Sequence, residues 1–359
     1  MRLDHLQQLR PVCPTCRAAG RDPAALVLGH VAVADGDEVL EGVLVCSQPA
    51  CQREHPIIDG IPVVVADIAS WASHQIAGVM RRDDLSAHAE SLLGDATGPG
   101  SEFHRERSNL GTYGWAHWGD MAPAGERQHG GAYAALLTDA LDLASAQPAG
   151  VWLDLGCSVG RGPLALARRG VALAVGVDLN FAMLRVAERV RRQGRACFPL
   201  RRGGVVFERF DAAVPDLPAM RMARTTHWCC DVSVLPFADA RFDGALLLNL
   251  LDCVTEPLAL LFETGRVLAP GGEVLFSSPY DWSPHATPMA QWLGGHSQRG
   301  AAGGSSVAEL RRILSADRAA GVDTGLVIDA ERDGVPWHVQ TGERSTMAYA
   351  VHMARLRRT

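Results

Sequence analysis

The segment at residues 151–162, VWLDLGCSVGRG, constrains the fold of this chain more than any other. It has the pattern of an apolar strand, a glycine-rich turn and the first turn of a helix, and strand-like and helix-like segments alternate after it. Such alternation predicts an α/β fold with a parallel, Rossmann-like sheet that binds ligands at the carboxyl ends of its strands. We expect strands at 151–155, 173–177, 226–230, 243–249, 272–278, 335–340 and 346–356, and helices at 161–169, 180–193, 257–268 and 306–315.

The glycine-rich turn indicates which ligand that sheet would bind. Gly156 and Gly160 would let the backbone approach a ligand closely, because neither carries a Cβ. Asp178, at the end of the next strand, is suited to bind both hydroxyls of a ribose. A dinucleotide loop requires the spacing G-x-G-x-x-G, whereas three residues separate the glycines here.

This form of the loop resembles motif I of class I S-adenosylmethionine-dependent methyltransferases, and later landmarks follow in the family's order. The resemblance implies a seven-stranded sheet that binds S-adenosyl-L-methionine. It places the first loop around the methionine part of the cofactor, Asp178 on the ribose and Leu179 against the adenine. It puts CCDVSVLPF near the adenine amino group and LLLNLLDCV at the mouth of the site. The cofactor-binding residues it implies are Asp154, Gly156, Cys157, Ser158, Gly160, Asp178, Leu179, Asp231, Val232, Asn249 and Leu250.

Residues from about 105 to 359 resemble, more narrowly, the methyltransferase domain of ovothiol-biosynthesis enzymes. The likeness is carried by DLGCSVGR, NLLDCV, SSPYDWSPHATPMAQWLGG and DGVPWHVQTGERSTMAYAVHMARLRR. In that family the acceptor is an imidazole nitrogen of 4-mercaptohistidine. We therefore expect a methyltransferase domain at 105–359, interrupted by an insertion at 195–225.

Methyl transfer needs an in-line nucleophile, a desolvated pocket and in some cases a base. Asp252, His117, Tyr113 and Tyr280 are the candidate catalytic residues. Asp281 and His338 are further candidate bases, although a histidine within a strand is more often structural. Tyr280 and Trp282, after a strand, either line the pocket or pack in the core.

The stretch NLGTYGWAHWGD, residues 109–120, concentrates rings in a chain that is only 6% aromatic. Its glycine and asparagine content argues against an ordinary buried helix. Because aromatic faces attract a sulfonium cation, we expect Tyr113, Trp115, His117 and Trp118 to form a lid over the cofactor. The alternative is that these rings anchor a linker to the edge of the sheet.

Two cysteine pairs near the N-terminus have the pattern of a structural zinc site. Cys13 and Cys16 are separated by two residues, and Cys46 and Cys51 by four; His55 or His30 could replace one sulfur. The stretch through PIIDGIP resembles the small zinc-ribbon proteins that activate tRNA, rRNA and release-factor methyltransferases. We expect a β-rich zinc-ribbon domain at 1–67 and a helical linker at 68–104.

Charge limits the partners that the chain could bind. The chain has no lysine, a formal net charge of -6, and five arginines against nine acidic residues within positions 1–67. Such a surface argues against binding a phosphate backbone. Seven arginines between 185 and 202 form either a solvated helix face or a site for a carboxylate, phosphate or RNA. Without a signal peptide or a long apolar run, the chain is expected to be cytoplasmic.

Three hypotheses of function remain at this stage. The first is methyl transfer to a small molecule, at an imidazole or amine nitrogen. The second is methylation of RNA, with the ribbon docking the nucleic acid. The third is a cofactor-binding interaction protein without turnover.

Overall fold

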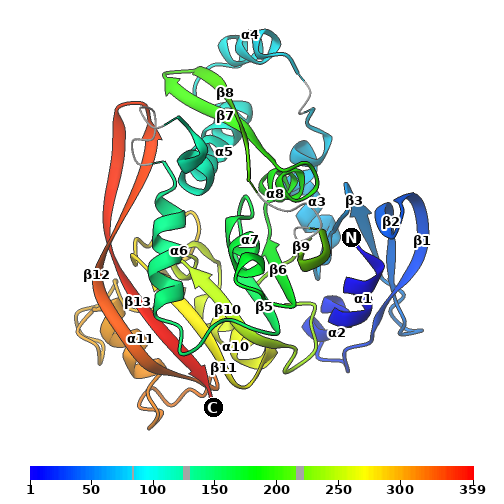
Figure 1. Ribbon diagram of the computed structural model, residues 1–359. Helices are drawn as coiled ribbons and strands as arrows, with labels where there is room; N and C mark the ends of the chain where they lie inside the picture. The colour runs from blue at the N-terminus through cyan, green and yellow to red at the C-terminus, as the bar shows by residue number, and fades with distance from the viewer. Residues whose placement is uncertain (83–84, 124–129, 216–221) are drawn as a thin grey trace.

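The computed structural model describes residues 1–82, 85–123, 130–215 and 222–359. Its centre is a seven-stranded sheet in the order β12-β13-β11-β10-β5-β6-β9 (Figure 1). Only β13 runs antiparallel to its neighbours in this sheet. The expected α/β fold is confirmed. The strands are β5 (Val151–Leu155), β6 (Leu173–Asp178), β9 (Thr225–Cys229), β10 (Phe242–Leu248), β11 (Leu268–Ser278), β12 (Leu326–Gly342) and β13 (Ser345–Arg358).

The two faces of this sheet are buried by different helices, because successive side chains of a strand point to opposite sides. Trp152, Leu246 and Leu275 pack with α6 (Ala132–Asp142) and α7 (Arg161–Arg168). Leu153 and Leu247, one position along, pack instead with α10 (Pro257–Val267) and α11 (Ser306–Ile313). Both faces are therefore apolar, as a covered, mostly parallel sheet requires.

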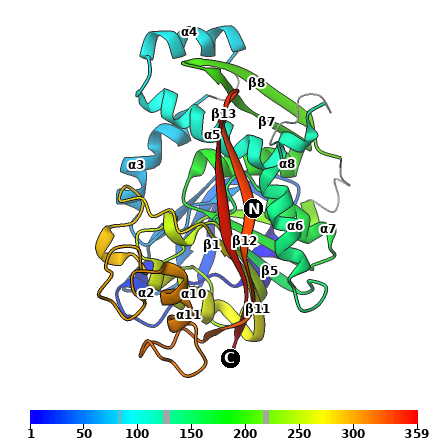
Figure 2. The ribbon, with the colours of Figure 1, turned by 90° about the vertical axis from the view of Figure 1, so that its left-hand side faces the viewer.

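The strands β12 and β13 form a hairpin much longer than the expected strands at 335–340 and 346–356. The extra length begins at Leu326 and includes charged, mostly exposed residues such as Asp329 and Arg332, which carry no apolar alternation. Figure 2 shows the hairpin rising along the sheet to the level of β7 (Arg195–Gly203) and β8 (Val206–Ala213). It thereby forms one side of the region above the carboxyl ends of the parallel strands.

The N-terminal residues form a separate four-stranded antiparallel sheet in the order β1-β2-β3-β4. Two short helices precede it, α1 (Leu3–Leu9) and α2 (Pro14–Ala18), which the strand pattern did not predict. The sheet contains β1 (Leu26–Asp35), β2 (Glu38–Cys46), β3 (Glu54–Ile58) and β4 (Ile61–Pro62). It joins the edge of the central sheet, where Val63 pairs in parallel with Cys229 and the Val64 N–H donates to the Cys229 carbonyl at 2.8 Å.

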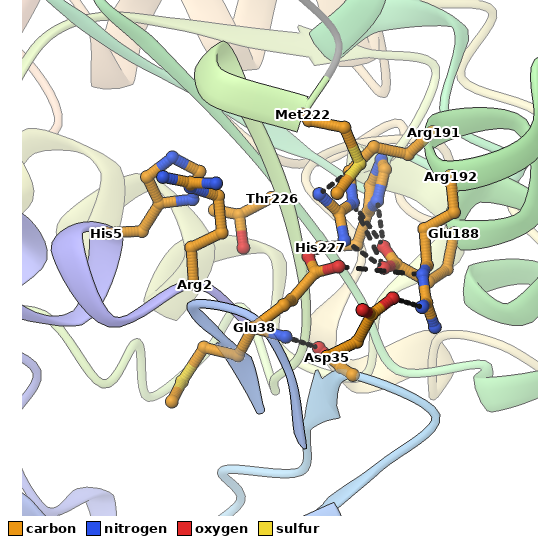
Figure 3. A network of polar contacts seen from close by, with 12 residues as sticks. Arg2, His5, Asp35, Glu38, Glu188, Arg191, Arg192, Met222, Thr226 and His227 are labelled. Carbon is orange, nitrogen blue, oxygen red and sulfur yellow. Dashed lines mark hydrogen bonds and ion pairs between the residues drawn. The ribbon is translucent and has the colours of Figure 1, made fainter. Parts of the chain in front are cut away.

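A buried ion network ties this N-terminal sheet to α8 (Phe181–Gln193) (Figure 3). Arg191, 4% exposed, donates to Glu188 one turn earlier and to Glu38 of β2. Glu188 also contacts Nδ1 of His227 in β9 at 3.2 Å. Burial alone would make each charge costly, so the network holds only while its members are paired.

The arginine-rich segment is therefore largely not a solvated face. Arg185 pairs with Asp59 and Arg192 with Asp35, so carboxylates of the N-terminal sheet meet the arginines of α8. The acidic balance of residues 1–67 and the basic segment that begins at 185 are two sides of one contact. This contact could not be predicted from the sequence, because nothing in the sequence indicates that the two segments lie side by side.

The segment between the two sheets contains α3 (Ile68–Met80), α4 (Ala87–Thr97) and the start of α5 (Glu102–Trp118). The expected insertion at 195–225 contains a hairpin of β7 (Arg195–Gly203) and β8 (Val206–Ala213); its residues 216–221 lie outside the described part of the chain. The described residues contain no helix long and apolar enough to cross a membrane.

The aromatic stretch at 109–120 is mostly helical, which corrects the expectation drawn from its glycines. Gly111 and Gly114 of α5 face β7: a Cβ on Gly111 would strike the carbonyl oxygen of Pro199, and one on Gly114 would lie 2.5 Å from the ring of Phe198. These glycines allow close helix-to-strand packing, and the helix forms despite their low intrinsic propensity because its buried face is packed.

Candidate active site

The loop after β5 is fixed by hydrogen bonds from its backbone to the end of β6. The N–H groups of Gly156 and Cys157 donate to the Val177 carbonyl, at 2.9 and 3.0 Å. The Ser158 N–H donates to Oδ2 of Asp178 at 2.9 Å, and the Asn180 N–H donates to Oδ1 at 2.8 Å. Asp178 is therefore fixed beside the loop, with one backbone donor on each oxygen.

The two glycines of the loop are required for packing within the protein. Both have positive φ, 72° at Gly156 and 83° at Gly160. A Cβ on Gly156 would lie 2.7 Å from Leu250, and a Cβ on Gly160 would lie 2.6 Å from Ala187 of α8. At Gly160 a side chain would meet the neighbouring helix α8, which is a second reason for glycine beside the close approach of a ligand.

A cleft of about 530 Å³ opens beside this loop, within the size range of small-molecule sites. Its walls come from six places: α5, Tyr133 of α6, the loop after β5, the end of β6 with the start of α8, the segments after β10 and β11, and the tip of the β12–β13 hairpin. The cleft thus lies at the carboxyl ends of β5, β6 and β10, where the sheet topology predicts a ligand.

Eight of the predicted site residues line this cleft. Three are predicted catalytic residues and five are predicted cofactor contacts: Tyr113, His117, Asp252, Gly156, Ser158, Asp178, Asn249 and Leu250. Asn249 has a left-handed φ of 52°, and its Oδ1 accepts a hydrogen bond of 2.8 Å from the Ser277 hydroxyl. Its amide nitrogen is buried and has no partner among the described residues.

The remaining predicted cofactor contacts do not line the cleft. The sulfur of Cys157 packs toward Gly176, on the far side of the loop. Leu179 is 45% exposed, beyond the end of β6. Asp231 Oδ1 accepts the N–H of Ser233 at 2.8 Å, and Val232 is buried in the core. Asp154 lies in β5, and Gly160 ends the loop at the start of α7.

Asp154 is 1% exposed and carries two carboxylate oxygens without a partner among the described residues. Burial first, and then the charge of Asp178, raises the pKa of Asp154 well above its usual range. A Cβ on Gly162 of α7 would strike its Oδ2, so the carboxyl occupies space that only a glycine leaves free. A buried carboxyl without a partner is costly unless it is protonated or meets a donor.

Comparison with known proteins identifies this part of the chain. Residues 153–276 match the protein family described as "Methyltransferase domain". The chain carries a methyltransferase domain. The matched range begins in β5 and ends in β11, so it contains the loop, Asp178 and the residues after β10.

Relatives of the methyltransferase domain are distant. A protein of Streptomyces fradiae, described as an uncharacterized 37.1 kDa protein in transposon TN4556, is 30% identical over 152 residues. The alignment covers 42% of this chain and 35% of that protein, so the chain spans about a third of the relative's length.

Similar solved structures include two N-methyltransferases. Phosphoethanolamine N-methyltransferase 2 of Haemonchus contortus, in complex with phosphomonomethylethanolamine and S-adenosylhomocysteine, is 23% identical with a TM-score of 0.31. That alignment covers 42% of this chain and 28% of the other. NodS of Bradyrhizobium japonicum is 15% identical with a TM-score of 0.38, covering 64% of this chain and 97% of the other.

Around the cleft of the methyltransferase domain, the four rings of the aromatic stretch separate into two pairs. Trp118 is fully buried, and its Nε1 donates to the Val159 carbonyl of the loop after β5 at 3.0 Å. Trp115 packs edge-on against Phe210 of β8. Tyr113 and His117 instead line the cleft. The helix thus anchors itself with its tryptophans and presents the other two rings to the cleft.

His117 is a neutral, buried group in this arrangement. Its ring stacks on Tyr133 with centroids 3.9 Å apart and planes 3° apart. Burial and the nearby Arg161 lower the pKa of His117 to about 3. Its Nδ1 is buried and has no partner among the described residues. At neutral pH the imidazole can exchange a hydrogen bond with a ligand but is too weakly basic to hold a proton.

Asp252 and Asp281, which also line the cleft, are linked by a hydrogen bond. Asp252 is 2% exposed, and its Oδ2 accepts the Asp281 N–H at 2.7 Å. Asp281 Oδ2 accepts the hydroxyl of Tyr349 at 3.0 Å. Burial first raises the pKa of Asp252, and the charge of Asp281 adds to it. The cleft therefore contains one buried and one exposed carboxylate in a connected pair.

Three other candidates lie away from the cleft. Tyr280 turns away through a left-handed φ of 55°, and its hydroxyl lies 2.8 Å from His352 Nδ1. Trp282 donates to Ser306 at 2.9 Å and stacks on Trp292. His338 lies on the opposite side of β12 from Trp337 and Val339, which line the cleft. Of the two alternatives for Tyr280 and Trp282, their contacts favour packing against the core.

The structure also adds cleft residues that the sequence analysis missed. Trp337 and Tyr349 stack across the β12–β13 hairpin, with centroids 5.1 Å apart. Trp337, Val339 and Thr341 alternate on one strand, and Met347 and Tyr349 on the other. The alternation of these apolar and aromatic residues was visible in the sequence, and it places them on one face of the hairpin. The candidate base His338 lies on the other face.

The predicted metal ligands gather at one point in the N-terminal sheet. The sulfurs of Cys13, Cys16, Cys46 and Cys51 all lie within 4.8 Å of one another. Cys13 and Cys51 are 3.9 Å apart, and Cys16 and Cys46 are 3.8 Å apart. Four thiolates around a tetrahedral zinc ion lie about 3.8 Å apart, so these residues fit that ion. His55 and His30 are not part of the cluster.

Proposed function

We propose that this protein transfers the methyl group of S-adenosylmethionine to a nitrogen of a small molecule, an imidazole or amine of an amino-acid-like or specialised metabolite. The observation that carries the proposal is a single cleft shared by two sets of residues. One wall has the loop from Gly156 and the fixed carboxylate of Asp178; the other has Tyr113, His117 and Asp252. A methyl donor and its acceptor must meet in such a shared space.

The cofactor would be held mainly by the loop and by Asp178. Asp178 would accept the ribose hydroxyls, and Leu179, Asp231 and Val232 would hold the adenine. Asp154, whose carboxyl is buried without a partner among the described residues, would receive the ammonium group of the cofactor. Cys157 and Gly160 shape the loop from below, and Asn249 and Leu250 close the mouth of the site.

The acceptor side would exclude water and orient the nucleophile. Tyr113 covers the cleft from α5, and His117, being neutral, offers a hydrogen-bonding nitrogen without a competing charge. We propose Asp252 as the group that receives a proton from the acceptor. Tyr280 would act at a distance, by fixing the segment that follows β11. Methyl transfer to an imidazole nitrogen, as in ovothiol biosynthesis, would suit this arrangement.

RNA is the less favoured acceptor. The charged side chains that line the cleft are carboxylates. Three arginines of α8 are engaged by the chain's own Asp35, Glu38 and Asp59: Arg185, Arg191 and Arg192. A strand of RNA would need free cationic groups along its path.

We further propose that residues 1–67 form a zinc ribbon, residues 68–104 a helical linker, and residues 105–359 the methyltransferase domain. Zinc would be held by Cys13, Cys16, Cys46 and Cys51 and would supply structural cross-linking, with no open position for chemistry.

The test is incubation with methyl-labelled S-adenosylmethionine and separate metabolite and RNA fractions. Label in the metabolite fraction is expected, and it should be lost when Asp178 is replaced by alanine. Label that enters RNA alone would rule out a small-molecule acceptor. Cofactor binding without any labelled product would favour an interaction protein instead.

A further inference from the structure

All the charged side chains that line the cleft are acidic. Its charged lining residues are Asp178, Asp252 and Asp281, and no arginine lines it among the described residues. The chain has no lysine at all. The remaining titratable base, His117, is neutral because burial lowers its pKa to about 3. Asp178 lies beside the loop after β5. The other two carboxylates, Asp252 and Asp281, lie in the part of the cleft lined by Trp337 and Tyr349, which we call its outer part.

The outer part is also built as a binding surface. Trp337 and Tyr349 present stacked rings from the hairpin, and Tyr349 fixes Asp281 through its hydroxyl. Aromatic faces attract cations, and they do so more strongly in a desolvated pocket. Carboxylates and rings together therefore favour a positively charged ligand and disfavour a carboxylate or phosphate.

Two unpartnered polar groups point to a ligand independently of the acidic pair. His117 is 3% exposed, lines the cleft, and has a buried Nδ1 without a partner among the described residues. The indole N–H of Trp337, also in the lining, is buried without a partner in the same part of the chain. Buried polar groups are normally hydrogen-bonded, so both leave a bond to be made by a bound molecule.

We infer that the outer part of the cleft is a subsite for a cationic acceptor, bound between the carboxylates of Asp252 and Asp281 and against the rings of Trp337 and Tyr349. The inference rests on the proposed methyl transfer and names the charge class of its acceptor. It predicts that the protein discriminates between acceptors that share an imidazole ring but carry side chains of opposite charge.

The same pair would prepare the nucleophile. A protonated nitrogen has no lone pair to donate, so one N–H bond must break first, and its proton passes to an oxygen of Asp252. The freed lone pair forms the new N–C bond while the S–C bond of the sulfonium breaks and its electron pair remains on sulfur. Burial raises the pKa of Asp252, which makes this carboxylate a better proton acceptor.

The test uses the full chain and three probes. S-adenosylhomocysteine is titrated first by calorimetry. Histamine and imidazole-4-acetate, which share an imidazole and carry opposite side-chain charges, are then titrated with S-adenosylhomocysteine saturating. Histamine should bind at least about tenfold more tightly, the effect of one charge-assisted hydrogen bond. D281N should abolish this preference and leave S-adenosylhomocysteine binding unchanged.

The control is D142N, which removes an exposed carboxylate of α6 outside the cleft and should retain the preference. Equal or tighter binding of imidazole-4-acetate would overturn the inference, and so would a preference that survives both D281N and D252N. Failure of both imidazoles to bind beside bound S-adenosylhomocysteine would overturn it too, while leaving the proposed function intact. Failure of S-adenosylhomocysteine itself to bind would remove the proposed function, and the inference with it.

Discussion

The hydroxyl of Tyr349 donates a hydrogen bond of 3.0 Å to Oδ2 of Asp281, joining the last strand of the sheet to the segment that follows β11. The Asp281 N–H in turn donates to Asp252 at 2.7 Å. The hairpin therefore positions the acidic pair of the cleft from outside. A change in the hairpin should alter acceptor binding before it alters the cofactor site.

Replacing Tyr349 by phenylalanine tests this coupling. The ring remains to stack on Trp337, but Asp281 loses a neutral hydrogen-bond donor, which contributes about 1 kcal/mol. We expect KM for the acceptor to rise about fivefold, while KM for S-adenosylmethionine and the melting temperature stay close to wild type. Steady-state kinetics with each substrate varied separately would measure this. A matching rise in both KM values would contradict the positioning role.

The glycines of α5 lead to a prediction about stability. Gly111→Ala adds a Cβ that would strike the backbone carbonyl oxygen of Pro199, which no side-chain rotation can relieve. We expect a loss of about 1–3 kcal/mol in the free energy of unfolding, measured by urea denaturation.

The matched control is Gly78→Ala in α3, where the nearest atom to a new Cβ is the Cβ of Ala182, at an ordinary 3.7 Å. This change should stabilise by up to about 1 kcal/mol, because alanine has the higher helix propensity. If both alanines stabilised the protein, α5 would not depend on close contact with β7.

Sequence predicted the parallel strands from β5 to β11 well, because each is a local run of apolar residues, but it did not predict β7, β8 or the first half of β12. Strand β5 was expected at 151–155 and lies at Val151–Leu155, and the loop and Asp178 follow from it. The direction of a side chain after a strand is not local information in the same way. Tyr280 has a left-handed φ that turns it toward His352, and neighbouring Asp281 reaches the cleft instead.

Contacts between distant segments account for the other errors. The helix α5 was rejected because its glycines lower helix propensity, and their purpose becomes visible only with β7 packed against them. Arg191 belongs to a segment for which the sequence left open a solvated face or a site for an anion, and its partner Glu38 lies 153 residues away in the chain. Tertiary packing decided both cases against the local pattern.

The neutral state of His117 predicts a dependence of stability on pH. Its pKa is lowered from 6.5 to about 3 in the folded protein. As pH falls below about 6.5 the unfolded chain binds a proton that the folded protein does not, so stability is lost progressively toward pH 3. The slope can reach about 1.4 kcal/mol per pH unit for such a group.

His117→Phe removes this contribution, so its unfolding free energy should fall less steeply than that of wild type between pH 6.5 and 4.5. Urea denaturation at several pH values would show the difference. His55→Phe offers a matched comparison, because burial also lowers the pKa of His55 to about 4. A slope unchanged by His117→Phe would mean that this imidazole is charged in the folded protein.

The cysteine cluster predicts a bound zinc ion in the purified protein. Elemental analysis should find one zinc ion per chain, and chelation should lower the melting temperature by on the order of 10 °C, because the ion cross-links two separate turns. Cys16→Ser should lose the metal. Cys197→Ser, a change in β7 outside the cluster, should keep it. Equal zinc content in the two variants would exclude the cluster as the metal site.

The ion network of Arg191 makes the strongest prediction for stability. Arg191→Met would remove the cation that Glu188 and Glu38 share, both of them buried at 4% and 3% exposure, and would leave Arg192, 3.5 Å from Glu38, as the remaining arginine partner. Removing one partner of a buried pair costs about 3–5 kcal/mol, because the remaining charges cannot be hydrated. The control Arg195→Met breaks an exposed pair with Asp211, and such pairs contribute about 0–1 kcal/mol. Urea denaturation should therefore separate the two variants by several kcal/mol.

Because Glu38 belongs to the N-terminal sheet, Arg191→Met should also expose that sheet to limited proteolysis, with cleavage between it and α8. Equal, small losses in both variants would mean that the two sheets are held together by apolar contacts alone.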